Sequence, residues 1–229
     1  LLQLPVSSPY KFPSNITLWA KKPIQTIVSF RVVLLYLRSI RRKTKHWAML
    51  FQLSEEQKMI RDAARDFAQN ECLPGVIERD EHQKFPYQQI MKLAELGFMG
   101  MMTDPKYGGS GMDTISYVLA MEEISKVDAS VSVCMSVNNS LVCWGLEKFG
   151  SEEQKQKYLV PLAQGRRDGE LYIGAFLLSE PEAGSDATSQ RTTAEDKGDY
   201  YLLNGTKNWI TNGSSASVYI VMAQSDPSK

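Results

Sequence analysis

The stretch Phe176-Leu-Leu-Ser-Glu-Pro-Glu-Ala-Gly-Ser-Asp186 decides how this 229-residue chain is interpreted, together with Asn208-Trp-Ile-Thr-Asn212. The first is predicted to be an apolar strand that enters a turn built from Pro181 and Gly184. Such a turn exposes backbone N–H groups, which can donate to a phosphate or to the polar edge of a planar ring. We predict that the second stretch is a strand in which Trp209 and Thr211 point to the same side. An ordinary β-hairpin has the same local pattern, so a ligand site and a plain hairpin both stay open.

The chain before these stretches has the spacing of helices. Ser54-Glu-Glu-Gln57 and Ser151-Glu-Glu-Gln154 are capping boxes, each of which marks the start of a helix. The apolar spacing predicts helices from 54 to about 72, from 86 to 97, after Asp113, and from 151 to about 165. A further helix, from about 130 to 149, is apolar on nearly all sides. It is therefore predicted to be buried, in this domain or against a partner subunit.

The spacing changes to that of strands after residue 170. Strand-like runs extend over 171–178, 200–203 and 218–223, and turns are predicted at 198–199 and 204–205. Helices followed by strands predict an α+β multidomain fold, with an all-α domain over 49–170 and an antiparallel β-domain over 171–229. Three or four strands are too few for a sandwich with two covered faces, so we expect the β-domain to be truncated.

The formal charge is zero, but it is unevenly distributed. Residues 1–48 contain nine Lys and Arg and no acidic residue, and the rest of the chain has 17 basic and 26 acidic residues. An acidic body argues against nucleic acid as a partner, since nucleic-acid recognition needs a basic face. The longest apolar run of the first segment, from Ile24 to Leu37, is too short to span a bilayer, so no membrane partner is expected.

Residues 1–48 admit two interpretations. The preferred one is non-native upstream sequence, because Met49 is the first methionine and stands directly before a helix start. That interpretation is compatible with a cytoplasmic bacterial protein. The alternative is a mitochondrial transit peptide, because the segment is basic, free of acidic residues and contains Ser and Thr; the protein would then lie in the mitochondrial matrix.

The cysteines and histidines argue against a metal site. Cys72, Cys134 and Cys143 show no CxxC spacing and are predicted to be reduced, mostly buried thiols. His46 and His82 lie far apart and have no cysteine partners. The glycine-rich loop over 104–113 has no strand before it and no complete GxGxxG, so it is predicted to be a tight turn and not a dinucleotide site.

Two motifs resemble the flavin-binding signature of the acyl-CoA dehydrogenase family, and they occur in the same order as in that family. They are Ser179-Glu-Pro-Glu-Ala-Gly-Ser-Asp186 and Leu203-Asn-Gly-Thr-Lys-Asn-Trp-Ile-Thr-Asn212. Tyr107-Gly-Gly-Ser-Gly111 resembles the family's Tyr-Gly-Gly-x-Gly motif. The resemblance runs from about Phe51 to the end and points to the short- and medium-chain branch. It implies a helical N-terminal domain, a middle β-domain and a C-terminal four-helix domain, of which this sequence would cover the first and about half of the second.

The resemblance implies that FAD is held non-covalently by both motifs. Backbone N–H groups and the Ser179 hydroxyl would contact the isoalloxazine, from a segment that includes Phe176, Leu178, Ser179, Gly184 and Ser185. Thr211 would place its hydroxyl near the flavin N5, next to Ile210, and Trp209 would pack at the ring edge. Ser185 matches the position near the acyl-CoA arm, although a turn serine bonded to local backbone explains it equally well. Leu177 and Glu182 stand where the family has smaller residues, and Glu182 is expected to face solvent.

The resemblance also implies the reaction. A carboxylate removes the α-proton of an acyl-CoA thioester while the β-hydrogen leaves as hydride to FAD, which gives a trans-2-enoyl-CoA. The electrons would pass to an electron-transferring flavoprotein, and the family tends to form homotetramers. The base of this branch lies in the C-terminal domain, so no catalytic residue is assigned. Glu122 and Glu123 are expected on a solvated face, and Glu180 in a structural role.

Two alternatives to the dehydrogenase stay open. One is an oxygen-using relative that resembles the acyl-CoA oxidases. The other is a non-catalytic helical interaction module of the same fold, against which the Trp-Ile-Thr triplet at 209–211 counts. Because an incomplete β-domain leaves an open sheet edge and an uncovered apolar face, we expect the chain by itself to be inactive, and to aggregate or bind flavin weakly.

Overall fold

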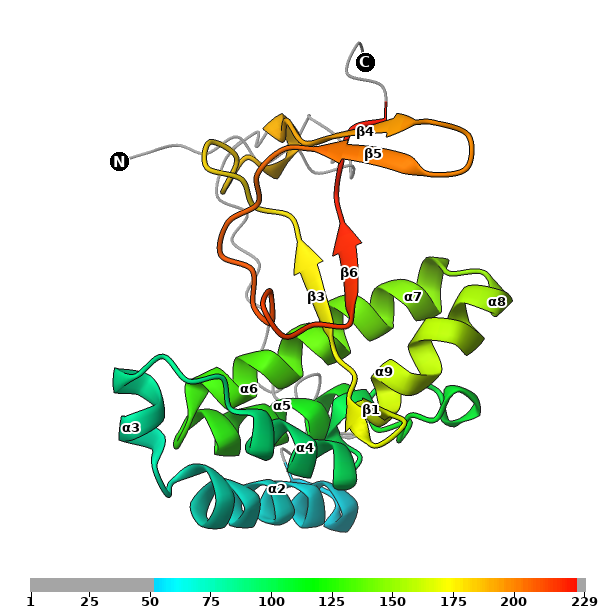
Figure 1. Cartoon of the computed structure of the whole chain (residues 1–229). Coiled ribbons are helices and arrows are strands. Elements are labelled where there is room, and N and C mark those ends of the chain that lie inside the picture. Colours follow the sequence, from blue (N-terminus) through cyan, green and yellow to red (C-terminus); the bar gives the residue numbers. More distant parts are fainter. Residues whose placement is uncertain (1–51, 226–229) are drawn as a thin grey trace, which may run out of the picture. The chain divides into compact units, whose positions relative to one another are not determined.

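The computed structural model describes residues 52–225, in which helices precede strands (Figure 1). The predictions for residues 1–48 lie outside this range. The helices are α2 (Glu55–Phe67), α3 (Val76–Glu81), α4 (Tyr87–Glu95), α5 (Thr114–Ser125), α6 (Ala129–Ser136), α7 (Trp144–Phe149), α8 (Glu152–Gln154) and α9 (Val160–Gln164). Three π-helical segments continue them, at Ala68–Cys72, Val137–Cys143 and Lys155–Leu159, and short 3₁₀ turns lie at Phe98–Gly100, Pro105–Tyr107 and Ala187–Ser189.

The helix starts follow the capping signals of the sequence. Both predicted capping boxes are formed, with the Ser54 hydroxyl accepting from Gln57 N–H and the Ser151 hydroxyl accepting from Gln154 N–H. Asp113 caps α5 by accepting from Ser116 N–H at 2.7 Å. Each cap stabilises its helix by about 1 kcal/mol. Sequence reasoning did not predict α3, a helix of six residues with no fully buried side chain.

The helical core forms where α2, α4, α5 and α6 pack together. Its fully buried members before the sheet are Ala64, Ala68, Cys72, Ile90, Leu93, Met99, Met101, Ala120, Ile124, Val131 and Met135. Full burial of a side chain such as Leu93 contributes roughly 1.5–3 kcal/mol. This core holds the N-terminal end of the following sheet, because Ile173 is packed into the same cluster.

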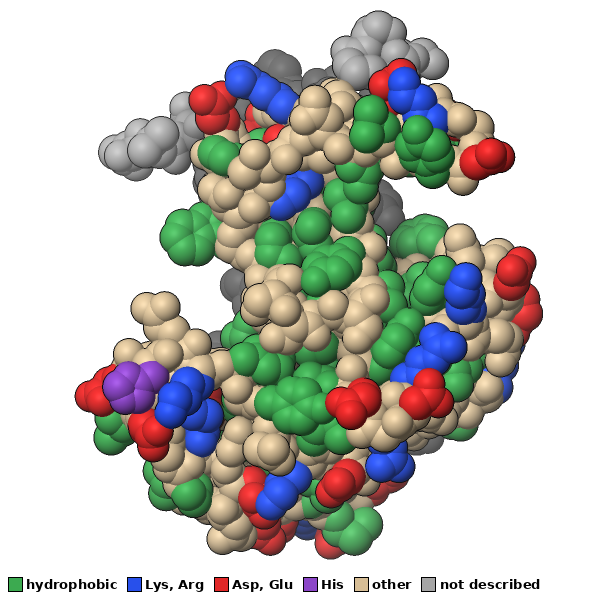
Figure 2. All heavy atoms as spheres, viewed as in Figure 1, with side chains coloured by type: hydrophobic (Ala, Val, Ile, Leu, Met, Phe, Trp, Pro, Cys, Tyr) green, Lys and Arg blue, Asp and Glu red, His purple; other side chains and the backbone are tan. Residues whose placement is uncertain are grey.

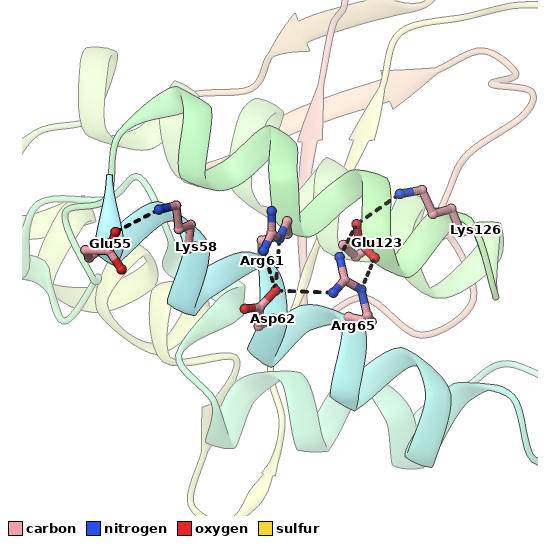
Figure 3. Close-up of polar contacts among 7 residues, drawn as sticks. All are labelled: Glu55, Lys58, Arg61, Asp62, Arg65, Glu123 and Lys126. Atoms are coloured by element: carbon pink, nitrogen blue, oxygen red, sulfur yellow. Dashed lines mark hydrogen bonds and ion pairs between the residues drawn. The ribbon is translucent and has the colours of Figure 1, made fainter. Parts of the chain in front are cut away.

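One prediction about this layer is wrong. Glu123 was expected on a solvated face, but it is buried and accepts hydrogen bonds from Arg65 Nε at 3.0 Å, Arg65 Nη2 at 3.2 Å and Lys126 Nζ at 2.9 Å (Figure 3). The reason is tertiary, because α2 packs against α5 and brings Arg65 onto this carboxylate. Its neighbour Glu122 is exposed, as expected.

The segment Ala129–Phe149 is one continuous helix through α6, the π-helical turns and α7. It is the single helix of the described part that is long and apolar enough to cross a membrane by length and composition. Its middle carries two buried asparagines that bind other elements of the fold. Asn138 Nδ2 donates to the Met99 carbonyl at 2.8 Å and to the Leu162 carbonyl at 2.9 Å. Asn139 accepts from Met101 N–H at 2.7 Å and donates to the Phe98 carbonyl at 2.8 Å. The predicted burial therefore holds for the middle of the helix. It does not hold for the end, because α7 has no buried side chain and Trp144 and Phe149 are exposed.

Between residues 52 and 225, the strands form three pairs. They are β1 (Arg166–Arg167) with β2 (Glu170–Leu171), β3 (Gly174–Leu177) with β6 (Val218–Val221), and β4 (Thr193–Asp196) with β5 (Tyr201–Asn204). The expected antiparallel pairing is present in the first and third pairs, but β3 and β6 run parallel (Figure 1). The chain between them includes the β4–β5 hairpin and returns Val218 to the side of Gly174, so that β6 runs in the direction of β3.

The remaining predictions about this region concern thiols, metals and glycines. Cys72, Cys134 and Cys143 are free and buried, as predicted. Within residues 52–225, no group of three or more His, Cys, Asp or Glu is placed to hold a metal ion. The glycine-rich loop is a tight turn, as predicted: a Cβ at Gly109 would lie 2.1 Å from the Thr103 carbonyl oxygen.

Candidate functional site

The edge of β3 that faces away from β6 is the starting point of the site. In a parallel pair, alternate residues direct their backbone groups to the partner strand. Leu177 faces β6, since its carbonyl accepts from Met222 N–H at 3.0 Å. Gly174 faces the opposite edge, where Asn138 Oδ1 accepts from its N–H at 2.9 Å and Asn212 Nδ2 donates to its carbonyl at 3.0 Å. By the same alternation, the backbone N–H and carbonyl groups of Phe176 and Leu178 point to this second edge.

Several backbone groups on that edge are open. The Leu178 carbonyl accepts from Lys207 Nζ at 2.9 Å. In the described part of the chain, no partner is bonded to the N–H and carbonyl of Phe176 or to the N–H of Leu178. These groups form a donor, acceptor, donor row along a half-buried strand. Half-buried backbone groups need a partner, so the row favours a ligand whose edge alternates acceptor, donor and acceptor.

The turn after β3 is held by Glu180. Glu180 and Ala183 exchange backbone hydrogen bonds at 3.1 and 3.2 Å. The Glu180 carboxylate is buried and accepts from Arg191 N–H at 2.5 Å, Thr192 N–H at 2.9 Å and Lys207 Nζ at 2.8 Å. The Lys207 bond, followed by those from Thr192 and Arg191, lowers the pKa of Glu180 from 4.5 to about 2. Glu180 therefore has the structural role predicted for it.

Most of the other residues of this turn are exposed. Gly184 and Ser185 lie on the surface, and the Ser185 hydroxyl bonds to none of residues 52–225. The local hydrogen bond proposed as an alternative for Ser185 is thus not formed. Glu182 faces solvent, as predicted, and pairs with Arg191 at 2.9 Å. The carboxylate of Asp186 accepts from the hydroxyls of Ser189 and Thr188, which lower its pKa.

The stretch 208–212 is not a strand, and that prediction is wrong. Residues 205–217 lie outside the strands, with a turn at 211–215, and Trp209 has φ 59° and Asn212 has φ 64°. Asn208 N–H donates to the Ser179 carbonyl at 2.9 Å, and Gly213 N–H closes a turn on the Ile210 carbonyl at 3.0 Å. Trp209 and Thr211 are therefore not placed on one side by the alternation of a strand, as had been predicted. Trp209 is 93% exposed, whereas Ile210 and Thr211 are half-buried.

A cavity of about 830 Å³ lies beside this loop, next to α3 and the start of α6. Figure 2 shows the surface hollowed between the part that carries α3 and the part that carries the strands. Its apolar wall includes Phe85, Val133 and Ile210, and Thr211 contributes a hydroxyl. A polar wall contains the ion pair of Arg79 and Asp128, with 2.9 Å between Nη2 and Oδ2. A cavity of this size and mixed lining is suited to a small organic ligand.

The structure thus brings the two predicted motifs together, at β3 and at the loop 205–217. Sequence reasoning missed three residues that hold them in place: Asn138, Lys207 and Asn212. Lys207 and Asn212 lie inside the quoted motif, but their backbone acceptors are remote in the sequence. Asn138 is a polar residue within an otherwise apolar helix. Because buried amides are hydrogen-bonded, this position is the one signal in the sequence that could have indicated a tertiary hydrogen bond.

A helical domain followed by an open strand edge, with a cavity beside the loop 205–217, is the architecture of a protein that could bind a small organic ligand. Two family models match the chain. "Acyl-CoA dehydrogenase, N-terminal domain" matches residues 54–166, and "Acyl-CoA dehydrogenase, middle domain" matches residues 175–229. The chain belongs to the acyl-CoA dehydrogenase family.

Individual relatives agree with the family models. The short-chain specific acyl-CoA dehydrogenase of Clostridium acetobutylicum is 43% identical over 79% of this chain and 46% of its own length. The mitochondrial short-chain specific enzyme of Rattus norvegicus is 44% identical over 78% of this chain and 42% of its own. The chain therefore spans about half the length of the curated relatives it matches.

Solved structures show the same fold. Butyryl-CoA dehydrogenase of Megasphaera elsdenii has a TM-score of 0.72 and 43% identity, over 78% of this chain and 46% of its own. A chain of the structure described as the electron transferring flavoprotein of Acidaminococcus fermentans has a TM-score of 0.73 and 48% identity, over the same shares. Glutaryl-CoA dehydrogenase of Mycobacterium smegmatis in complex with FADH2 has a TM-score of 0.70 and 36% identity, over 76% of this chain and 44% of its own.

Proposed function

We propose that this chain binds FAD and acts in the oxidation of a short-chain acyl-CoA thioester to a trans-2-enoyl-CoA. The observation that carries the proposal is the donor, acceptor, donor row formed by Phe176 and Leu178 on the open edge of β3. The pyrimidine edge of an isoalloxazine presents an N–H between two carbonyl acceptors, which is the complementary pattern. The FADH2 complex of a structural neighbour supports the choice of cofactor.

Both motifs would hold the cofactor. Phe176 and Leu178 offer backbone groups, Ser179 adds a hydroxyl, and the exposed turn at Gly184 and Ser185 leaves room for a bulky ligand. In the second motif, Ile210 and Thr211 would face the ring, and the exposed indole of Trp209 would lose its contact with water by covering the ring edge. Bound FAD supplies a hydride acceptor, and the protein supplies orientation and electrostatics.

The substrate would enter the cavity that Thr211 shares with Phe85 and Val133. An apolar wall suits a short acyl chain, and the names of the relatives support short-chain acyl-CoA. Ser185 is proposed to contact the acyl-CoA arm. No residue of this chain is assigned as the base that removes the α-proton.

The remaining parts of the proposal concern partners and organisation. We propose an electron-transferring flavoprotein as the electron acceptor and a homo-oligomer as the assembly, and the structural neighbour described as such a flavoprotein supports the first. We also propose domain limits of 49–170 and 171–229, which the matched ranges 54–166 and 175–229 support. Relatives occur in bacteria and in mitochondria, so both proposed locations have a precedent.

The test is an anaerobic titration of the full-length protein, followed by visible absorption. We expect a flavin spectrum that is bleached by butyryl-CoA and much less by palmitoyl-CoA. Rapid reoxidation in air after bleaching would favour the oxygen-using alternative. A colourless protein to which added FAD does not bind would contradict the flavoenzyme and leave the interaction module.

A further inference from the structure

Lys207 lies between the two motifs, and the family resemblance gives it no role in the site. Its side chain is 7% exposed. The ammonium group donates to Glu180 Oε1 at 2.8 Å, to the Leu178 carbonyl at 2.9 Å and to Gln190 Oε1 at 3.2 Å. An ammonium group has three N–H donors, so this one is fully bonded to protein and is not free to bind a ligand.

The Lys207 and Glu180 pair joins three separate segments. Glu180 lies in the turn that follows β3, and its carboxylate accepts from the backbone N–H groups of residues 191 and 192. Lys207 belongs to the loop that carries Trp209 and Thr211. That loop is tied to the end of β3 a second time, because Asn208 N–H donates to the Ser179 carbonyl. The pair therefore fixes the relative position of the two halves of the proposed flavin site.

Lys207 also acts on the open row of β3. The Leu178 carbonyl accepts from Lys207 Nζ at 2.9 Å and lies on the same edge of the strand as Leu178 N–H. This charge-assisted bond therefore fixes the orientation of the residue that supplies the last N–H of the row. Ser179 N–H belongs to the same trans peptide unit as the Leu178 carbonyl and points in the opposite direction, away from the row.

We propose that Lys207 is a positioning residue of the flavin site, which acts with Glu180 to hold the end of β3 against the loop 205–211 and to fix Leu178 N–H toward the flavin. This inference rests on the proposed flavin function. A purely structural ion pair would affect folding but not the electronic properties of a bound flavin. Replacing a buried ion pair by neutral groups is often neutral for stability, so stability by itself does not decide between the two roles.

The test compares the full-length wild type with three variants. Lys207→Met removes the charge and the donors. The double variant Glu180→Gln/Lys207→Gln removes both charges and keeps amide groups that can bond to each other. Lys197→Met is the matched control, since Lys197 also pairs with a glutamate, Glu195, at 2.5 Å, but in the β4–β5 hairpin and with 37% of its side chain exposed. The readouts are the thermal midpoint of the apo-protein, the FAD dissociation constant and the midpoint potential of the bound flavin.

We expect Lys207→Met to weaken FAD binding by roughly tenfold or more, the size expected for lost bonds to a charged group. Lys207→Met should also lower the flavin potential, because reduced flavin carries more negative charge and the variant leaves Glu180 without its positive partner. The double variant should change the potential less, because it removes one charge of each sign, but it should weaken FAD binding, since the bond to the Leu178 carbonyl is lost. Lys197→Met should match the wild type. A folded double variant with wild-type affinity for FAD would overturn the inference, even if Lys207→Met does not fold. Failure of the wild type itself to bind FAD would overturn the proposed function and, with it, the inference.

Discussion

At the scale of single residues, the buried carboxylate of Glu123 links stability to pH. Hydrogen bonds from Arg65, then from Lys126, hold the pKa of Glu123 below 4.5, against the opposing effect of burial. A carboxyl group whose pKa is lowered by folding stabilises the protein above its unfolded pKa, and this contribution is lost as the pH falls through the folded pKa. The contribution of Glu123 should therefore be complete near pH 7 and decline below about pH 4.5.

We predict that Glu123→Gln lowers the free energy of unfolding by roughly 1–2 kcal/mol at pH 7, because Arg65 is half-exposed and solvent screens part of the pair. The difference from wild type should shrink as the pH falls below 4.5. Glu122→Gln is the matched control, since Glu122 pairs with the same Lys126 at 3.0 Å but is exposed. Urea denaturation from pH 3 to pH 7 checks this, and an equal effect of the two substitutions would count against the account.

At the scale of elements, the contact of β3 with the π-helical segment Val137–Cys143 decides where the open edge lies. Gly174 allows this contact, because a Cβ there would lie 2.4 Å from Val142 Cγ1. Asn138 and Asn212 bind its N–H and carbonyl and so join helix, strand and loop. Gly174→Ala should cost about 1–3 kcal/mol through overpacking.

Gly184→Ala is the control for that substitution, because in the described part of the chain nothing lies within 4 Å of a Cβ at Gly184. Chemical denaturation of both variants measures the difference. Equal stability of the two would show that β3 does not pack against Val142 as described.

The elements also show which features local sequence could predict. Capping boxes at Ser54 and Ser151 predicted helix starts, because a cap depends on residues three positions apart. The second motif was wrongly predicted as a strand, because Asn208 and Asn212 bind Ser179 and Gly174, which are remote in the sequence. The parallel pairing of β3 with β6 was missed for the same reason.

At the scale of the whole molecule, the order of helices before strands predicted the fold class, since segregated patterns exclude an alternating fold. The two motifs predicted which segments meet. The open row on β3 could not be predicted, because it depends on which edge β6 leaves free and on which groups Asn138, Lys207 and Asn212 already occupy.

The most direct test of the flavin site is hydrogen–deuterium exchange of the full-length protein with and without FAD, resolved to short peptides. FAD should slow exchange in peptides that cover 174–186 and 205–213, where the amides of Phe176, Leu178 and Ser179 are open, and leave α2 unchanged. Binding of FAD without protection of these two segments, or with protection confined to other parts of the chain, would contradict the account.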